Sequence, residues 1–289
     1  MRKWSECPSC ASTRHRVIYA HNPGKCVDGS VVKCLACSLL YKIPFEENFD
    51  ATQANVDEYT GNFIEDDLIA QAELAEVLDF LCHARKERRG KLLELGCGPG
   101  KFLSLAQDKG FDVSGVEATQ ELAESARQKT GGDIIVGDIL HADLKGDKFD
   151  VIVLLDLIEH LQDPVAALVN YKDHIKDDGA VLVFTPNHSS FIVRIAQFLY
   201  TISLGVIKKP CEEIFDCLHV IFFDRRTLRQ TLEKAGYEIT GTKMISYRPE
   251  RRNLATGLTA SILRRIEEAS QFFPNGPFRV AMLARPKQE

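Results

Sequence analysis

Residues 92–102 read Leu-Leu-Glu-Leu-Gly-Cys-Gly-Pro-Gly-Lys-Phe, an apolar stretch that runs into glycines at every second position. The apolar part has the composition of a buried strand, and Gly96, Gly98 and Gly100 allow a sharp turn after it. Such a turn admits a ligand close to the backbone and opens the next helix with unpaired N–H groups. The segment therefore predicts a nucleotide-type pocket at the end of a strand.

The spacing of these glycines separates two kinds of ligand. The dinucleotide fingerprint is G-x-G-x-x-G, whereas here a single residue separates the second and third glycines, and Glu94 lies two positions before the first. A carboxylate at that place is unfavourable for a diphosphate and useful for a ligand that carries an ammonium group. The pattern E-x-G-x-G-x-G resembles motif I of the Rossmann-like (class I) S-adenosylmethionine (SAM)-dependent methyltransferases. A glycine-rich turn without a ligand is the alternative.

The next strands extend the resemblance. Residues 111–117 form a second apolar segment that ends in Glu117, about twenty residues after the glycines. A carboxylate at this place can accept hydrogen bonds from both ribose hydroxyls. A solvated residue at a helix start is the alternative for Glu117. Residues 133–139 end in Asp138 and Ile139, which the resemblance places at the adenine amino group and against the ring. Residues 149–156 have the apolar composition of a central parallel strand.

Together these strand ends define an expected SAM site. The resemblance implies a contact set that lies at or just after the strands: Glu94, Gly96, Cys97, Gly98, Gly100, Glu117, Ala118, Asp138, Ile139, Leu155 and Asp156. Tyr59 and Phe63, ahead of the glycine loop, are expected either to close over SAM or to anchor the chain through hydrophobic contacts.

A further motif narrows the resemblance to a subgroup. Residues 157–164, Leu-Ile-Glu-His-Leu-Gln-Asp-Pro, match the E-H-x-x-D-P segment of the ubiquinone-biosynthesis-like O-methyltransferases, as do residues 184–187 and His219. The resemblance spans residues 55–245 and implies methyl transfer to a small molecule, a sugar or a lipid- or glycan-linked acceptor. It does not identify that acceptor, nor whether O, N or C is methylated.

Candidate catalytic residues follow from the chemistry. Transfer from a sulfonium is an in-line displacement, so the protein aligns the reactants, excludes water and supplies a base for a hydroxyl. His219 is the preferred base, and His160 is expected mainly to brace a helix start. Glu159 is a candidate base or a group that orients a histidine. Each histidine has a structural alternative.

The order of elements predicts the fold class. Strands that alternate with helices give a doubly wound α/β sheet, and the resemblance implies seven mostly parallel strands with the last, residues 278–284, antiparallel. Residues 64–89 and 254–273 are expected to be helical. The division expected is a zinc ribbon over residues 1–48 and a methyltransferase domain over residues 49–289.

The ribbon is indicated by two C-x-x-C knuckles, Cys7 with Cys10 and Cys34 with Cys37. Four thiolates complete a closed tetrahedral site, so the zinc is expected to be structural and to be needed for folding of this segment. Accidental knuckles or a redox dithiol are the alternatives. Other candidates as ligands lie between the knuckles: His15, His21 and Cys26. The other cysteines are expected to be buried thiols: Cys82, Cys97, Cys211 and Cys217.

Composition limits the remaining possibilities. The chain has 289 residues, 45% of them hydrophobic, nine cysteines and a net charge of −5, without a Lys/Arg block, which argues against a large nucleic-acid footprint. The N-terminus lacks an apolar leader, so a cytoplasmic location is expected. Residues 191–207 are strongly apolar and predict an acceptor lid with peripheral membrane contact; core packing or a dimer interface is the alternative.

Two other functions stay open. One is an RNA methyltransferase that grips nucleic acid through the ribbon, which carries more basic than acidic residues but no basic and aromatic interleaving. The other is a non-catalytic protein that binds SAM as a sensor or scaffold, because an intact pocket implies binding only.

Overall fold

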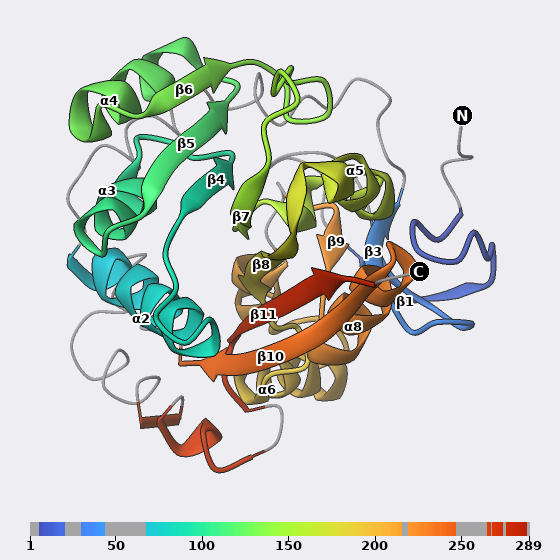
Figure 1. Cartoon of the computed structure of the whole chain (residues 1–289). Coiled ribbons are helices and arrows are strands. Elements are labelled where there is room, and N and C mark those ends of the chain that lie inside the picture. Colours follow the sequence, from blue (N-terminus) through green and yellow to red (C-terminus); the bar gives the residue numbers. More distant parts are fainter. Residues whose placement is uncertain are drawn as a thin grey trace.

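A computed structural model gives the fold of the chain (Figure 1). It describes residues 6–20, 30–43, 68–215, 219–246, 265–266, 268–273 and 276–287. Several predictions from sequence concern positions outside these ranges: Tyr59, Phe63, His21, Cys26, Cys217, the boundary between residues 48 and 49, and most of the helix expected over 254–273.

The main sheet has seven strands in the order β10-β11-β8-β7-β4-β5-β6. Their bounds are β4 Lys91–Leu95, β5 Asp112–Glu117, β6 Asp133–Val136, β7 Phe149–Leu155, β8 Ile175–Pro186, β10 Tyr237–Ile245 and β11 Arg279–Pro286. Strands β4 to β8 pair in parallel, and β11 lies antiparallel between β8 and β10. The predicted seven-stranded sheet with an antiparallel last strand is confirmed.

Successive side chains of the central strands enter two different cores, as the period of a strand requires. Leu92, Val151 and Val153 pack with α2 (Leu68–Ala84), α3 (Lys101–Asp108) and α4 (Gln120–Thr130). Leu93, Ile152 and Leu154 pack on the opposite face with α5 (Pro164–Asn170) and α8 (Arg225–Lys234). Helices on both faces explain why these strands are apolar throughout.

The N-terminal segment forms a second, antiparallel sheet. Its strands are β1 (His15–Ala20), β2 (Ser30–Cys34) and β3 (Leu40–Ile43), and the order is β1-β2-β3-β9. The fourth strand, β9 (Ile221–Phe222), belongs to the distant segment just before α8. Strand β9 was not predicted, because a strand of two residues has no detectable periodicity.

Two helices follow β8, and the first of them lies within the apolar segment 191–207. They are α6 (Phe191–Ile202) and the short α7 (Lys209–Ile214), separated by a turn at Leu204 and Gly205 with positive φ. The helix expected over residues 64–89 is described as α2 and ends at Ala84, before Lys86 and Glu87, whose φ values are positive. In the described part of the chain, no helix is both long and apolar enough to cross a bilayer.

Candidate active site

The glycine loop connects β4 to α3 and contains three residues with left-handed backbone: Gly96, Gly98 and Gly100 have φ of 67°, 51° and 75°. A Cβ at Gly100 would lie 3.0 Å from the Cα of Ala126, and one at Gly96 would lie 3.1 Å from Leu157 Cδ1. A Cβ at Gly98 would meet no atom within 4 Å. Gly96 and Gly100 therefore serve packing, and Gly98 borders open space that a ligand can use.

Glu117, at the end of β5, fixes the loop from the neighbouring strand. Its side chain is buried, and its two oxygens accept hydrogen bonds from the backbone N–H of Gly98 at 2.8 Å and of Thr119 at 2.9 Å. An ionised carboxylate has about four lone-pair sites, so acceptor capacity remains. The same side chain can shape the loop and accept hydroxyl groups of a ligand.

Glu94 is a second buried carboxylate, on β4. Its Oε2 has no hydrogen-bond partner among the described residues. Burial, and then the neighbouring Glu117, raise the pKa of Glu94 well above its usual value. An unpartnered buried carboxylate is costly in free energy, and a cationic ligand group would offset that cost.

Asp138 and Ile139 follow β6, the edge strand next to β5. Asp138 is exposed; its carboxylate accepts from the backbone N–H of Leu140 at 2.9 Å and lies 2.8 Å from His141 Nδ1. Ile139 is buried, and its carbonyl accepts a hydrogen bond from the Tyr171 hydroxyl. Because β4, β5 and β6 are adjacent and parallel, their carboxyl ends place all of these residues along one edge of the sheet (Figure 1).

The end of β7 carries Leu155 and Asp156. Asp156 has a positive φ of 49°, and both of its carboxylate oxygens lie 2.5 Å from Arg279 Nη2 of β11. The Arg279 guanidinium also lies 4.2 Å from the centre of the Phe184 ring. Asp156 is thus held toward β11 by a buried arginine. The remaining two members of the expected set, Cys97 in the loop and Ala118 after β5, are buried and half-buried.

Glu159, His160 and His219 converge beside β7. Glu159 and His160 lie in a short 3-10 turn, Ile158–His160, and their ligand atoms and those of His219 all lie within 4.8 Å of one another. His219 Nε2 is 4.0 Å from Glu159 Oε1, and the rings of His160 and His219 have centroids 4.8 Å apart in an edge-to-face arrangement. Each of these three residues was a separate candidate from the sequence, and the fold places their side chains next to one another.

The electrostatics of this cluster favour a neutral Glu159. Its side chain is fully buried, and burial followed by the charge of Asp156 raises the pKa of Glu159 to about 8. Its Oε2 accepts a hydrogen bond of 2.9 Å from Thr185 Oγ1. The group of one carboxylate and two imidazoles can exchange protons, and its donor atoms also suit a divalent cation.

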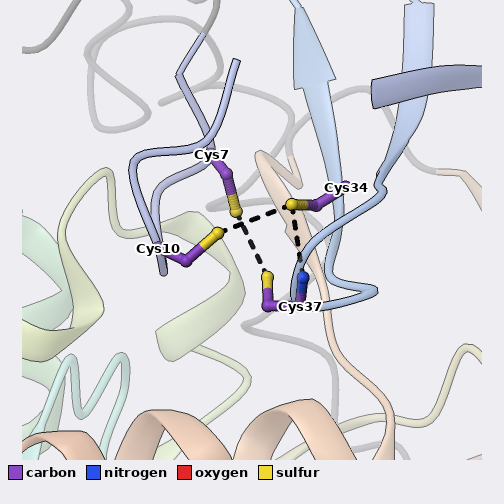
Figure 2. Close-up of side chains that lie close together, drawn as sticks. All are labelled: Cys7, Cys10, Cys34 and Cys37. Carbon is purple, nitrogen blue, oxygen red and sulfur yellow. Dashed lines mark hydrogen bonds between the residues drawn. The ribbon is translucent and has the colours of Figure 1, made fainter. Parts of the chain in front are cut away.

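The four knuckle cysteines lie together at the end of the small sheet (Figure 2). Cys7 Sγ is 3.5 Å from Cys37 Sγ, Cys10 Sγ is 3.5 Å from Cys34 Sγ, and all four sulfurs lie within 4.8 Å of one another. Two backbone N–H groups, of Ala36 and Cys37, point at Cys34 Sγ. Sulfurs on a tetrahedral zinc are about 3.8 Å apart, given a Zn–S bond of about 2.3 Å, so this spacing fits zinc. His15 is outside the cluster and packs edge-on against Tyr41.

Comparison with known proteins assigns the family. A family model described as "Methyltransferase domain" matches residues 67–241, from α2 into β10. The chain belongs to this methyltransferase family.

Curated relatives of this methyltransferase cover part of it. It is 24% identical to the ubiquinone biosynthesis O-methyltransferase of Rickettsia felis over 163 residues, which are 55% of the chain and 65% of that relative. The corresponding protein of Rickettsia canadensis is 30% identical over 161 residues, covering 54% of the chain and 66% of the relative. The methyltransferase thus spans just under two thirds of these relatives' length.

Solved structures share the fold. A SAM-dependent methyltransferase from Archaeoglobus fulgidus matches with a TM-score of 0.51 and 18% identity, over 74% of this chain and 93% of that one. Magnesium protoporphyrin IX methyltransferase from Synechocystis PCC 6803, solved with bound SAH, matches with a TM-score of 0.55 and 13% identity, over 82% and 96%. At these identities the likeness shows the fold of SAM-dependent methyltransferases.

Two buried polar residues at the site of this methyltransferase were not predicted from the sequence. Arg279 is one, and no local motif marks it. The other is His188, whose ring lies 4.9 Å from that of Phe222 and 6.4 Å from that of His219, and whose pKa burial lowers to about 4. His188 follows the Phe-Thr-Pro-Asn segment directly, so its position next to a recognised motif was the available signal.

Proposed function

We propose that this methyltransferase uses SAM to methylate a hydroxyl oxygen of a small molecule, a sugar or a lipid- or glycan-linked acceptor. The observation that carries the proposal is the pairing of an open Gly98 surface with the buried, unpartnered carboxylate of Glu94. SAM carries an ammonium and a sulfonium, so it satisfies that carboxylate, whereas a dinucleotide would bring a pyrophosphate toward it.

The proposed SAM contacts follow the strand ends. Glu94 faces the ammonium group of the methionine part of SAM, and Gly98 lies against the bound SAM molecule. Glu117 accepts hydrogen bonds from the ribose hydroxyls and also holds the loop. Asp138 accepts from the adenine amino group, and Ile139 lies against the ring. We extend the proposal to the neighbours of these residues: Gly96, Cys97, Gly100, Ala118, Leu155, Asp156 and, outside the described residues, Tyr59.

His219 is the proposed general base. SAM supplies an electrophilic methyl group, and the acceptor oxygen attacks it in line with the departing sulfur. The hydroxyl proton passes to an imidazole nitrogen of His219, and the methyl–sulfur bond breaks as the methyl–oxygen bond forms. Because Glu159 has a raised pKa, it is protonated near neutral pH and orients His219. His160 packs on His219 and limits the motion of its ring.

Zinc is the proposed metal at the four knuckle cysteines. Four thiolates at tetrahedral spacing leave no open position, so the ion is structural. Peripheral membrane contact through residues 191–207 is a further part of the proposal, and it is tested separately below.

Recognition of RNA by the ribbon is the less favoured function. Stacking of bases requires exposed aromatic rings beside basic residues. In the described part of the ribbon, both tyrosines, Tyr19 and Tyr41, are buried. Retention of RNA that weakens steeply with salt would support this alternative, and SAM binding without turnover across a broad acceptor screen would support a sensor or scaffold.

Titration calorimetry with SAM tests the pocket. In Glu117→Ala, two backbone N–H groups lose a charged acceptor and the loop loses its support, so SAM affinity should fall at least tenfold. Gly98→Ala should also weaken binding; its Cβ meets no atom within 4 Å, and the positive φ of Gly98 limits the loss of stability to about 1 to 2 kcal/mol of backbone strain. Exposed Glu121 on α4 provides the control, Glu121→Ala, which should bind SAM normally.

Two results would reject the pocket. One is wild-type SAM affinity in Glu117→Ala, and the other is tighter binding of NADH than of SAM to the unmodified protein.

A further inference from the structure

Strand β9 belongs to two parts of the molecule at once. It lies between His219 and α8 in sequence, yet it pairs antiparallel with β3 of the ribbon, Leu40 opposite Phe222 and Tyr41 opposite Ile221. The backbone N–H of Lys42 donates to the carbonyl of Val220 at 3.0 Å, which extends the pairing to the residue after His219. The ribbon sheet therefore ends next to the proposed base.

Val220 carries the connection across to Glu159. Its N–H donates to the Glu159 carbonyl at 3.0 Å, while its carbonyl accepts from Lys42. One residue is thus hydrogen-bonded on one side to ribbon strand β3 and on the other to the turn that holds Glu159 and His160. The position of the His219 backbone depends on both bonds, because His219 precedes Val220.

The second knuckle sets the start of β3. The N–H of Cys34 donates to Leu39 at 2.9 Å, the N–H of Ser38 donates to Cys34 at 3.1 Å, and Cys37 lies within that turn. Cys34, Leu39 and Tyr41 share a core with Val220 and Ile221. Without a metal, the four thiols add only weak sulfur hydrogen bonds to these backbone bonds, whereas a zinc ion would bind all four sulfurs.

From this arrangement we infer that zinc at the four cysteines controls the order of the acceptor side of the active site. The metal holds the knuckle and β3; β3 holds β9 and Val220; these fix His219 and Glu159. The SAM side depends on β4, β5 and their loop, which the two backbone hydrogen bonds to Glu117 hold together. This inference rests on the proposed function for the identity of the metal and the role of His219.

Hydrogen exchange of the full chain, with zinc and after chelation, tests the inference. Loss of zinc should speed exchange at residues 219–223 and 158–161 at least tenfold, and exchange at 96–100 and 117–119 should change less than twofold. SAM affinity by calorimetry should also change less than twofold. Returned zinc should restore the original rates. Cys37→Ser removes one of the four sulfurs and should change the exchange rates as chelation does. Cys82→Ser, at a buried cysteine outside the cluster, is its matched control and should leave these rates unchanged.

A second variant breaks the link while the cysteines stay intact. Lys42→Pro removes the N–H that donates to the Val220 carbonyl, and it leaves the four cysteines in place. The variant should therefore retain one zinc per chain and still show fast exchange at residues 219–223. In NMR spectra, the imidazole signals of His160 and His219 should shift in this variant and in zinc-free protein. The signals of exposed His83 and half-buried His174 should not shift, which separates repositioning of the site from general loosening.

Three outcomes are decisive. Purified protein without zinc would reject the metal assignment in the proposed function. Bound zinc whose removal loosens residues 34–41 but leaves 219–223 protected would overturn the coupling alone. If removal of zinc abolished both SAM binding and hydrogen-exchange protection throughout the chain, the coupling would also be overturned, because zinc would then support the whole fold.

Discussion

Two buried carboxylates, Glu94 and Glu117, have opposite hydrogen-bonding environments in this site. Both oxygens of Glu117 are occupied by backbone N–H groups, whereas Oε2 of Glu94 has no partner among the described residues. Burial therefore acts on Glu94 without compensation and raises its pKa. Ionised Glu94 therefore destabilises the free protein, and a bound cationic group would offset this destabilisation.

Glu94→Gln should change the pH dependence of stability. Because the pKa of Glu94 is higher in the folded state than its ordinary 4.5, its contribution is present at low pH and is lost as pH rises from about 4.5 through the folded-state pKa. Wild-type protein should lose up to about 1.4 kcal/mol per pH unit in that window, and Glu94→Gln should lose less. Urea unfolding between pH 5 and 8 measures this.

The same variant should bind SAM more weakly than wild type, because an amide carries no charge to pair with the ammonium group of SAM. Glu121→Gln on the exposed face of α4 is the control and should follow the wild-type curve. Equal pH slopes for wild type and Glu94→Gln would show that Glu94 does not carry this cost.

The histidines make the second prediction at this scale. His219→Ala should lower turnover about a hundredfold or more and remove a limb of the pH–rate profile, while SAM affinity stays within twofold. His160→Ala should have a smaller effect on turnover, since it removes a ring packed on His219, and should lower stability. His83→Ala, exposed on α2, is the control. Full activity in His219→Ala with none in His160→Ala would reverse the two assignments.

At the scale of elements, α6 presents apolar side chains to both sides. Val193 and Ala196 are buried, and Tyr200 packs edge-on against Tyr19 of β1, with ring centroids 5.1 Å apart. The opposite side and the turn after it leave four large apolar residues exposed by 58% to 94% of their surface: Phe198, Ile202, Leu204 and Val206. An apolar stripe next to Lys208 and Lys209 suits a bilayer surface with anionic headgroups.

Liposome flotation tests this stripe. Wild-type protein should float with vesicles that contain anionic lipid, and Phe198→Glu and Leu204→Glu should reduce the bound fraction at least fivefold. Val169→Glu, at a half-exposed valine on α5, is the matched control. A wild-type protein that never floats, but forms a dimer that Phe198→Glu dissociates, would make the stripe an oligomer interface.

At the scale of the whole molecule, the antiparallel insertion of β11 joins the C-terminal part of the chain to its centre. Arg279 of β11 is buried and reaches Asp156 at the end of β7, with the Phe184 ring of β8 against its guanidinium. Three strands are thereby linked at the edge where the site lies. A buried arginine at this junction tolerates loss of its partner poorly.

Arg279→Met and Asp156→Asn should each destabilise the protein by about 2 to 3 kcal/mol, below the range for fully buried pairs because the Asp156 side chain is 33% exposed. The double variant should cost less than the sum of the two, since the charges are removed together. Urea unfolding of all four proteins measures the coupling. Simple additivity would mean that the pair contributes no coupling energy, and a large loss of SAM affinity in Asp156→Asn would favour its predicted place in the SAM site.

Local sequence patterns predicted the doubly wound sheet and the glycine loop, whereas the seven strands and the antiparallel last strand were implied by the family resemblance. The sheet and the loop depend on neighbours in the chain: apolar runs make buried strands, glycines allow the positive φ at Gly98, and acids at strand ends meet because parallel strands end on one edge. The cysteine cluster followed in the same way from two short knuckles.

Tertiary packing alone decided the rest. Strand β9 has two residues and no periodicity, and it exists because β3 offers an edge to pair with. His219 meets Glu159 and His160 across a long stretch of sequence, and Arg279 finds Asp156 only once β11 has entered the sheet. Such contacts depend on which surfaces fold against each other, and no local pattern encodes that choice.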